Sequence, residues 1–371
     1  MKRITCFTES LGGGGAEHQM VILAGLLEKE GYDVTIVTYA SIPDHYDTPR
    51  GVKRIDIGRT QVKRKGMKAF IKLLKCFHYF LWLQTDCIIA YRKCANLRVL
   101  PPMFFRSRKK IKVICSDRNA FERMAFQSKL LINGLYHRAD YIVPNSLTKA
   151  SFILQQKPSL SSKIQTIQNY TDLQQFSPSE IPYEISVIKI AIFSSYSSHK
   201  NPIGLARAVK ELKQKTNISF EVHWYGTQKN AAGIYITDYL IFKKEVDNLG
   251  IKDVLFLFPA VKNPAALMNN YHAVCLPSFS EGFSNSIAEG ICSGKPMLVS
   301  DVSDNSQMVH DGENGFLFKP KQTGNIVEAF MRFLSLSYDE MCRMGQRSRE
   351  IAEELFDKEH FISQYIDLIE S

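Results

Sequence analysis

The stretch RITCFTESLGGGGAEHQMVILAGLLEKEGYDVTIVTY, residues 3–39, decides the fold class of this chain. It starts with an apolar run at residues 3–7 and passes through a glycine-rich loop at residues 12–15. Apolar residues then recur at helical spacing from residue 16 to residue 30, and a second apolar run follows at residues 33–39. A strand, a loop, a helix and a second strand in this order predict a parallel β-α-β unit.

The same alternation continues along the chain and predicts two domains. Short apolar runs at residues 87–90, 112–115 and 141–144 extend the first series of strands, and a second series begins at residues 186–194. Between the two series, residues 175–183 are polar and carry two prolines, which is typical of a domain boundary. We therefore expect an α/β protein of two Rossmann-like, doubly wound domains. Their expected bounds are residues 1–180 and 181–354, with a last helix at about residues 355–371 that packs back on the first domain.

Length and composition exclude several protein classes. A chain of 371 residues is too long for one comfortable core. Hydrophobic residues make up 45% and charged residues 23%, which is typical of a globular protein rather than a disordered one. The eight cysteines form no C-x-x-C pair, so we expect buried thiols in a reducing compartment and no structural zinc site. No apolar run is long enough for a signal peptide or a membrane span, and we expect a cytoplasmic protein.

The net charge of +10 is concentrated in the first half of the chain. Residues 1–180 hold 28 Lys and Arg against 14 Asp and Glu, whereas the remaining residues hold 19 against 23. Much of the excess falls on a stretch with apolar and aromatic residues at helical spacing. This stretch is either an ordinary helix packed on its own domain or a peripheral contact with anionic lipids at the inner face of the cytoplasmic membrane. No nucleic-acid recognition module occurs, so we expect no nucleic-acid partner. The basic residues are Arg59, Lys63, Arg64, Lys65, Lys68, Lys72 and Lys75, with a second cluster at Arg106, Arg108, Lys109, Lys110 and Lys112.

The most informative candidate for a functional site is PSFSEGFSNSIAEGICSGKPMLVSDVSDNSQMVHDGENGFLF, residues 277–318. A strand is expected to end where this stretch begins, and a helix starts near Ser284. Backbone N–H groups at such a helix N-terminus suit the diphosphate of a nucleotide sugar. Glu281 and Glu289 bracket the helix start, and each carboxylate can accept two hydrogen bonds from the adjacent hydroxyls of a ribose or hexose. The expected donor contacts here are Glu281, Gly282, Phe283, Ser284, Asn285 and Glu289.

The two glutamates, followed by SGKPMLVSD and DGENGFLF, resemble the donor site of retaining GT-B glycosyltransferases of family 4. The resemblance implies that Glu289 binds the ribose, and that Glu281 contacts the transferred sugar and stabilises developing positive charge. It implies two Rossmann-like domains facing a cleft. It also implies a metal-independent, front-side reaction in which the leaving phosphate helps to deprotonate the acceptor hydroxyl. The sequence contains no D-x-D dyad suited to a metal–diphosphate bridge.

A second match is SSYSSHKNPIGLARAV, residues 194–209. The resemblance implies that Lys200 neutralises the diphosphate as the sugar–phosphate bond breaks, whereas a plain surface lysine is the alternative. The arginine that the family carries about five residues earlier is absent. Ser194 and Ser195 stand there instead, and Ser195 is the expected donor contact. This departure leaves open whether a hydroxyl and the helix dipole, or another basic residue, replace the arginine.

Two short loops extend the predicted donor site. LGGGGAEHQM resembles the family's GGAE loop, in which Gly14 and Gly15 let a phosphate or sugar approach the backbone closely. Glu17 in the same loop either contacts the acceptor or caps the helix that follows. The turn at residues 259–261 resembles the base-binding loop, so the backbone of Val261 is expected to contact the nucleobase.

A third loop, ICSDRNAFER, lies in the first domain after the strand that ends at Cys115. Many family members carry a histidine there, and this chain has Asp117, Arg118 and Asn119 instead. These three residues are expected on the acceptor side. Arg118 is expected to hold a donor hydroxyl or an anionic acceptor, with a plain Asp–Arg surface pair as the alternative. A guanidinium does not act as a base at neutral pH.

Together these patterns predict a retaining glycosyltransferase with Glu281, Lys200 and Arg118 as catalytic residues. It would move a hexose or N-acetylhexosamine from a nucleotide sugar, preferably a UDP-sugar, to a glycan acceptor, with no cofactor and no metal. By analogy with the family, the acceptor is expected to be linked to a polyprenyl diphosphate and to serve surface polysaccharide or glycan assembly. Two alternatives stay open, namely a nucleotide-sugar epimerase and a non-catalytic protein that binds sugar nucleotides.

Overall fold

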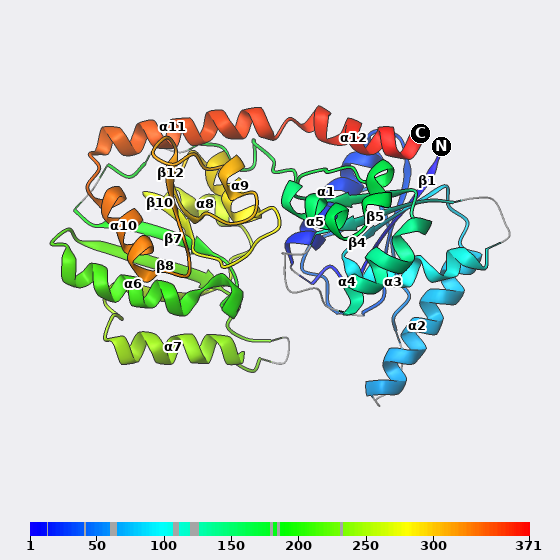
Figure 1. Ribbon diagram of the computed structural model, residues 1–371, viewed down its shortest axis with the longest axis horizontal. Coiled ribbons are helices and arrows are strands. Elements are labelled where there is room, and N and C mark those ends of the chain that lie inside the picture. Colours follow the sequence, from blue (N-terminus) through cyan, green and yellow to red (C-terminus); the bar gives the residue numbers. More distant parts are fainter. Residues whose placement is uncertain are drawn as a thin grey trace. The chain divides into compact units, whose positions relative to one another are not determined.

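The computed structural model describes residues 1–12, 14–40, 42–59, 65–106, 111–118, 126–178, 181–183, 186–230 and 233–371. The chain forms two compact units (Figure 1), of which the first comprises Met1–Tyr170 and Lys358–Ser371 and the second comprises Thr171–Asp357. The sequence prediction placed the division near residue 180. The structure places it earlier because Phe176 is buried in an apolar cluster of the second unit, and Ile181 is buried in another.

The first unit is built on a six-stranded parallel sheet with the strand order β3-β2-β1-β4-β5-β6. The central strand β4 is buried along its whole length, as its continuous apolar sequence CIIAY requires in a sheet covered on both faces. The strands are β1 (Arg3–Thr8), β2 (Asp33–Thr38), β3 (Lys53–Asp56), β4 (Cys87–Tyr91), β5 (Lys112–Asp117) and β6 (Tyr141–Pro144).

Helices cover both faces of this sheet. On one face, Leu23 of α1 and Tyr365 of α12 belong to a buried cluster with strand residues such as Cys6. On the other face, Phe80 of α2 packs in a second cluster with Phe7. The helices are α1 (Gly15–Lys29), α2 (Lys65–Trp82), α3 (Lys93–Val99), α4 (Phe126–Leu130), α5 (Leu147–Gln156) and α12 (Lys358–Glu370), with short turns η1 (Pro101–Phe104), η2 (Leu131–Leu135), η3 (Tyr136–Arg138) and η4 (Pro158–Lys163).

The second unit repeats this plan with the strand order β12-β11-β10-β7-β8-β9, again all parallel. Buried residues of α6, α7 and α10 cover one face, and those of α9 and α11 cover the other. The strands are β7 (Ile188–Phe193), β8 (Phe220–Gly226), β9 (Leu255–Pro259), β10 (Ala273–Leu276), β11 (Met297–Ser300) and β12 (Gly315–Phe318). The helices are α6 (Pro202–Lys215), α7 (Thr237–Leu249), α8 (Pro264–Met268), α9 (Asn285–Cys292), α10 (Thr323–Leu334) and α11 (Tyr338–Leu355), with η5 (Ser198–Lys200) and η6 (Asn305–Gln307).

The strand order reverses once in each sheet, between β1 and β4 in the first unit and between β7 and β10 in the second. In open parallel sheets, ligands bind outside the carboxyl ends of the strands at this reversal. The loops that follow these four strands are therefore the places to look for a site.

The predicted α/β fold of two Rossmann-like, doubly wound units is confirmed. The edge strand β3 was not predicted from sequence, because its four residues, KRID, are charged at three positions and only partly buried. All eight cysteines are free thiols. No helix in the described ranges is long and apolar enough to cross a bilayer.

Candidate functional site

The strand-order reversal of the second unit carries an ion pair between two of the predicted residues. Lys200 ends the turn η5 after β7, and Glu281 lies in the loop after β10. The Nζ atom of Lys200 is 2.5 Å from Oε1 of Glu281, and the two side chains are only 15% and 9% exposed. A charge-assisted hydrogen bond this close and this shielded from water fixes both groups at the carboxyl edge of the sheet.

The backbone around Lys200 is fixed by its neighbour Asn201, which has φ 58° and lies in the left-handed region that asparagine tolerates. The side chain of Asn201 accepts a hydrogen bond from the Gly204 N–H at 3.1 Å, and it donates one to the Pro320 carbonyl at 2.9 Å. Asn201 therefore caps α6. The Phe279 N–H donates to the His199 carbonyl at 2.8 Å, which ties the Lys200 loop directly to the Glu281 loop.

The N-terminus of α9 follows Glu281 directly. Ser284 is the N-cap residue, with extended backbone (φ −83°, ψ 115°), and its side chain makes no capping hydrogen bond within the described residues. Gly282, Phe283 and Ser284 are buried, whereas Asn285 is partly exposed. The sequence prediction of a helix start at this point thus matches the element bounds, and the positive end of the helix dipole lies beside the Lys200–Glu281 pair.

Glu289 lies in the second turn of α9 and is partly buried. Burial removes water from its carboxyl group and raises the pKa of Glu289 to about 8. A carboxyl group held in this way at a strand-order reversal is typical of a functional site rather than of an exposed helix face.

The other predicted donor contacts of this unit lie after neighbouring strands. Ser195 follows β7, is exposed, and its hydroxyl lies 2.6 Å from that of Ser197. Val261 follows β9 and is partly buried. Both residues are at the same carboxyl edge as Lys200, because all strands of this sheet run parallel.

In the first unit, Glu17 and Arg92 form a second ion pair, again at the strand-order reversal. Glu17 lies in the first turn of α1 after β1, and Arg92 follows β4. Arg92 Nη1 is 2.7 Å from Glu17 Oε1, and the Glu17 side chain is 5% exposed. A Cβ at Gly14, the N-cap residue of α1, would lie 2.2 Å from Glu17 Oε2, so a side chain there would displace the Glu17 carboxylate. Gly15 is the first residue of the helix.

Arg92 was not predicted from sequence, because no motif marks it. Only the structure marks Arg92 as a candidate site residue, because its φ of 79° is rare for a residue with a side chain. Strained backbone of this kind clusters at functional sites.

The structure places Arg118 deep in the first unit. Its Nε donates to Ser116 Oγ at 2.9 Å, its Nη2 donates to Tyr365 Oη at 2.6 Å, and its Nη1 donates to Asn169. The guanidinium also stacks 4.4 Å above the ring of Tyr91. These contacts hold helix α12 against the sheet, and the catalytic role of Arg118 stays a prediction.

Asp117 is also buried, with Lys149 Nζ at 3.5 Å and the Tyr136 hydroxyl at 3.4 Å. Asn119 lies outside the described residues. The structure therefore brings Lys200, Glu281 and the α9 N-terminus together in one unit, and Gly14 and Glu17 in the other. Among the residues that the structure describes, no group of three or more His, Cys, Asp or Glu side chains is arranged to hold a metal ion.

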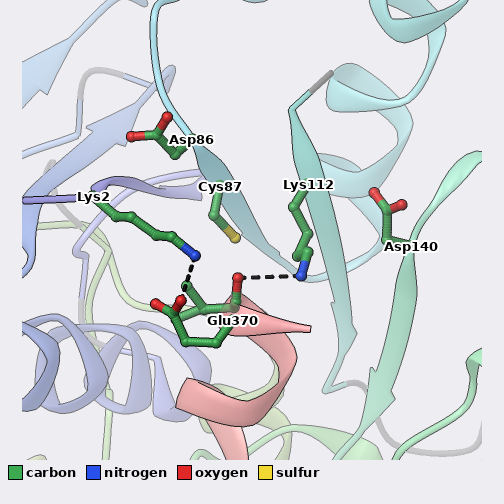
Figure 2. Close-up of a pocket in the computed structure, with 7 residues that line it drawn as sticks. Lys2, Asp86, Cys87, Lys112, Asp140 and Glu370 are labelled. Atoms are coloured by element: carbon green, nitrogen blue, oxygen red, sulfur yellow. Dashed lines mark hydrogen bonds and ion pairs between the residues drawn. The ribbon is translucent and has the colours of Figure 1, made fainter. Parts of the chain in front are cut away.

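Figure 2 shows a pocket of the first unit that lies at the opposite, amino-terminal edge of the sheet. Lys2 Nζ is 2.5 Å from Glu370 Oε2 there, and Lys112 Nζ donates to the Ile369 carbonyl at 3.1 Å. The C-terminal end of α12 packs in this pocket. Because the pocket is away from the carboxyl ends of the strands, we do not expect it to bind substrate.

A known family model matches the part of the chain that holds the Lys200–Glu281 pair. Residues 186–351 match the family model described as "Glycosyl transferases group 1". This match supports a glycosyltransferase.

Proteins similar to the chain include two curated glycosyltransferases and one solved structure. The D-inositol 3-phosphate glycosyltransferase of Nocardia farcinica is 28% identical over 57% of this chain, and the match spans only 48% of that protein. The N-acetylgalactosamine-N,N'-diacetylbacillosaminyl-diphospho-undecaprenol 4-alpha-N-acetylgalactosaminyltransferase of Campylobacter jejuni is 23% identical over 96% of both chains. The structure of HepE (Alr3699) from Anabaena, in complex with UDP and glucose, covers 100% of both chains with a TM-score of 0.79 and 16% identity. The chain therefore has the GT-B fold.

Proposed function

We propose that this protein is a retaining glycosyltransferase that moves a hexose or an N-acetylhexosamine from a UDP-sugar to a glycan acceptor. The observation that carries this proposal is the buried Lys200–Glu281 pair beside the N-terminus of α9, at the strand-order reversal of the second unit. A cation and the N-terminus of a helix suit the diphosphate of a nucleotide sugar, and the carboxylate beside them suits the hydroxyl groups of the sugar. Retention of configuration is supported by the family resemblance of residues 277–318.

In the proposed donor complex, the diphosphate lies at the α9 N-terminus and takes over part of the Lys200 ammonium charge. Lys200 and the helix dipole then stabilise the charge that develops on the leaving phosphate. Glu281 faces the transferred sugar, Glu289 accepts hydrogen bonds from the ribose, and the Val261 backbone meets the base. These groups supply the charge stabilisation in the proposed reaction, which needs no metal ion.

We place the acceptor on the first unit, with Glu17 as a contact to its hydroxyl groups. The position of Glu17 beside Arg92 at the strand-order reversal supports this assignment. A lipid-linked glycan is the proposed acceptor class, because the Campylobacter relative is named for a diphospho-undecaprenol substrate. The predicted roles of Asp117, Arg118 and Asn119 on this side remain part of the proposal.

We also propose that helix α2 rests on an anionic membrane surface such as the inner face of the cytoplasmic membrane. Cys76 and Phe80 anchor the helix to its unit, whereas Phe70, Leu73 and Leu74 are 57%, 47% and 51% exposed. The N-terminal end of α2 projects away from the sheet (Figure 1). Exposed apolar side chains among lysines suit an interface between headgroups and acyl chains.

The deciding experiment measures binding and slow hydrolysis of a panel of UDP-, GDP- and ADP-sugars in the presence of EDTA. We expect one UDP-sugar to bind and turn over, and Lys200→Gln to abolish turnover. Lys215→Gln is the matched control, because Lys215 forms an exposed pair with Glu211 at 2.7 Å in the same unit. If the donor is converted to an epimeric nucleotide sugar without any added acceptor, the epimerase is favoured. If a nucleotide sugar binds but is not turned over under any condition, the non-catalytic protein is favoured.

A further inference from the structure

Ser303 stands out in the loop that follows β11. Its φ is 53°, which places a residue with a side chain in the left-handed region. That conformation costs free energy for any residue other than glycine, and it persists where surrounding contacts hold it. Ser303 is partly buried, so other residues surround its side chain and its hydroxyl can bind them.

The Ser303 hydroxyl binds both backbone groups of one residue, Glu281. Its Oγ donates a hydrogen bond to the Glu281 carbonyl at 2.6 Å and accepts one from the Glu281 N–H at 3.3 Å. A second link comes from the last residue of β11, because Ser300 Oγ donates to the Ser278 carbonyl at 2.6 Å. The loop that carries Glu281 is thus held at two points, by the end of β11 and by the loop that follows it.

The direction of a side chain follows from the backbone that carries it. Fixing the two peptide groups of Glu281 fixes where its Cα–Cβ bond points, and the carboxylate is then in place for the 2.5 Å contact with Lys200. We propose that Ser303 is a positioning residue, which acts through Glu281 by holding its carboxylate in the donor site. This inference rests on the proposed glycosyl transfer.

The test compares Ser303→Gly with Ser303→Ala. Both substitutions remove the hydroxyl, but glycine adopts φ 53° without strain whereas alanine does not. We expect Ser303→Gly to keep or raise the melting temperature relative to Ser303→Ala. In both variants kcat should fall by about 10- to 100-fold, since misplacement of a reacting group by about 1 Å costs on that order. Binding of UDP by calorimetry should stay within a few-fold of the wild type.

A double-mutant cycle separates positioning from a general structural effect. If Ser303 acts through Glu281, Ser303→Gly should change kcat little once Glu281 is already replaced by glutamine. Ser306→Ala serves as the control, because Ser306 is an exposed serine three residues further along the chain, in η6. The inference would be overturned if Ser303→Gly had the kcat of the wild type. It would also be overturned if Ser303→Gly lowered kcat by the same factor in the wild type and in the Glu281→Gln variant.

The two proposals fail in different ways. If the wild-type protein turns over no nucleotide sugar, the proposed function fails. If the wild type is active and Ser303→Gly is equally active, only the positioning role of Ser303 fails.

Discussion

At the scale of single residues, the proposed donor site pairs its own cation with a carboxylate. Lys200 is bound to Glu281 at 2.5 Å, and both side chains are largely buried. A diphosphate that binds at the α9 N-terminus must therefore compete with a carboxylate for the same ammonium group. The pair keeps Lys200 in place, but it also reduces the positive charge that the proposed site presents to a diphosphate.

Glu281→Gln separates these two effects. Without the carboxylate, Lys200 is free to interact fully with a phosphate, so we expect UDP alone to bind more tightly by a few-fold. Turnover of the donor should fall by about 100-fold, because the group that stabilises developing charge on the sugar is lost. Calorimetry with UDP and a hydrolysis assay check both parts, with Glu211→Gln as the exposed control. Weaker UDP binding together with normal turnover would contradict this account.

Glu289 gives a prediction for the pH dependence of stability. Its pKa is raised to about 8 by burial, so the folded protein binds a proton there that the unfolded chain releases above its ordinary pKa of 4.5. The contribution of this group to stability is therefore full in acid and is lost as the pH rises toward about 8. We expect Glu289→Gln to flatten the pH dependence of the free energy of unfolding between about pH 5 and pH 8, by an amount on the order of a few kcal/mol.

Urea unfolding at several pH values measures this effect. Glu328→Gln is the matched control, since Glu328 is an exposed glutamate on α10 of the same unit. Identical pH profiles for the wild type and Glu289→Gln would show that the carboxyl of Glu289 is not desolvated.

At the scale of elements, α9 and α2 illustrate two uses of a helix. Helix α9 presents its N-terminus at the carboxyl edge of a sheet, where the dipole favours an anion. Helix α2 instead leaves an apolar stripe uncovered on its own unit, although its opposite face is buried. The rings of Phe77 and Phe105 lie 5.8 Å apart, so Phe105, the residue directly after η1, extends the aromatic surface of α2.

The double substitution Phe70→Ser and Leu74→Ser tests the membrane contact of α2. These side chains are four residues apart and lie on one exposed face, so the melting temperature should change little. We expect the variant to lose most of its sedimentation with phosphatidylglycerol vesicles at low salt. Leu240→Ser with Ile241→Ser is the control, because these residues of α7 are 48% and 55% exposed. Equal recovery of wild type and variant in the supernatant would exclude the proposed contact.

At the scale of the whole molecule, the two units share one feature, an ion pair at the strand-order reversal. Each has one basic and one acidic side chain in the segments that follow the two strands at which the strand order reverses. In the second unit the base follows the first strand, whereas in the first unit the acid does. We therefore propose separate roles for the two pairs: the Lys200–Glu281 pair binds the donor, and the Arg92–Glu17 pair binds the acceptor.

A kinetic split tests that division. Arg92→Gln leaves Glu17 buried without its cation, so we expect KM for the acceptor to rise about tenfold or more. Hydrolysis of the donor without acceptor should stay unchanged, because the Lys200–Glu281 pair and the α9 N-terminus, which are proposed to carry it, lie in the second unit. Arg54→Gln is the control in the same unit, since Arg54 forms a surface pair with Asp44 at 3.0 Å. A parallel loss of donor hydrolysis would argue against separate roles.

The sequence by itself determined the alternating pattern of strands and helices, the glycine-rich loop and the position of the α9 N-terminus. These features depend on hydrophobic periodicity and local backbone preferences, which are written in neighbouring residues. It also marked Glu281 and Glu289, through their places at a predicted helix start and through the family resemblance, and Lys200 through the resemblance alone.

Only the tertiary structure decided which of these side chains meet. The Lys200–Glu281 and Arg92–Glu17 pairs join residues 81 and 75 positions apart, and parallel strand pairing brings each pair together. The left-handed backbone of Arg92 and Ser303, the raised pKa of Glu289 and the burial of Arg118 likewise depend on packing from distant segments. The physical reason is the same in each case: desolvation and backbone strain are properties of the folded surroundings, and local sequence carries no record of them.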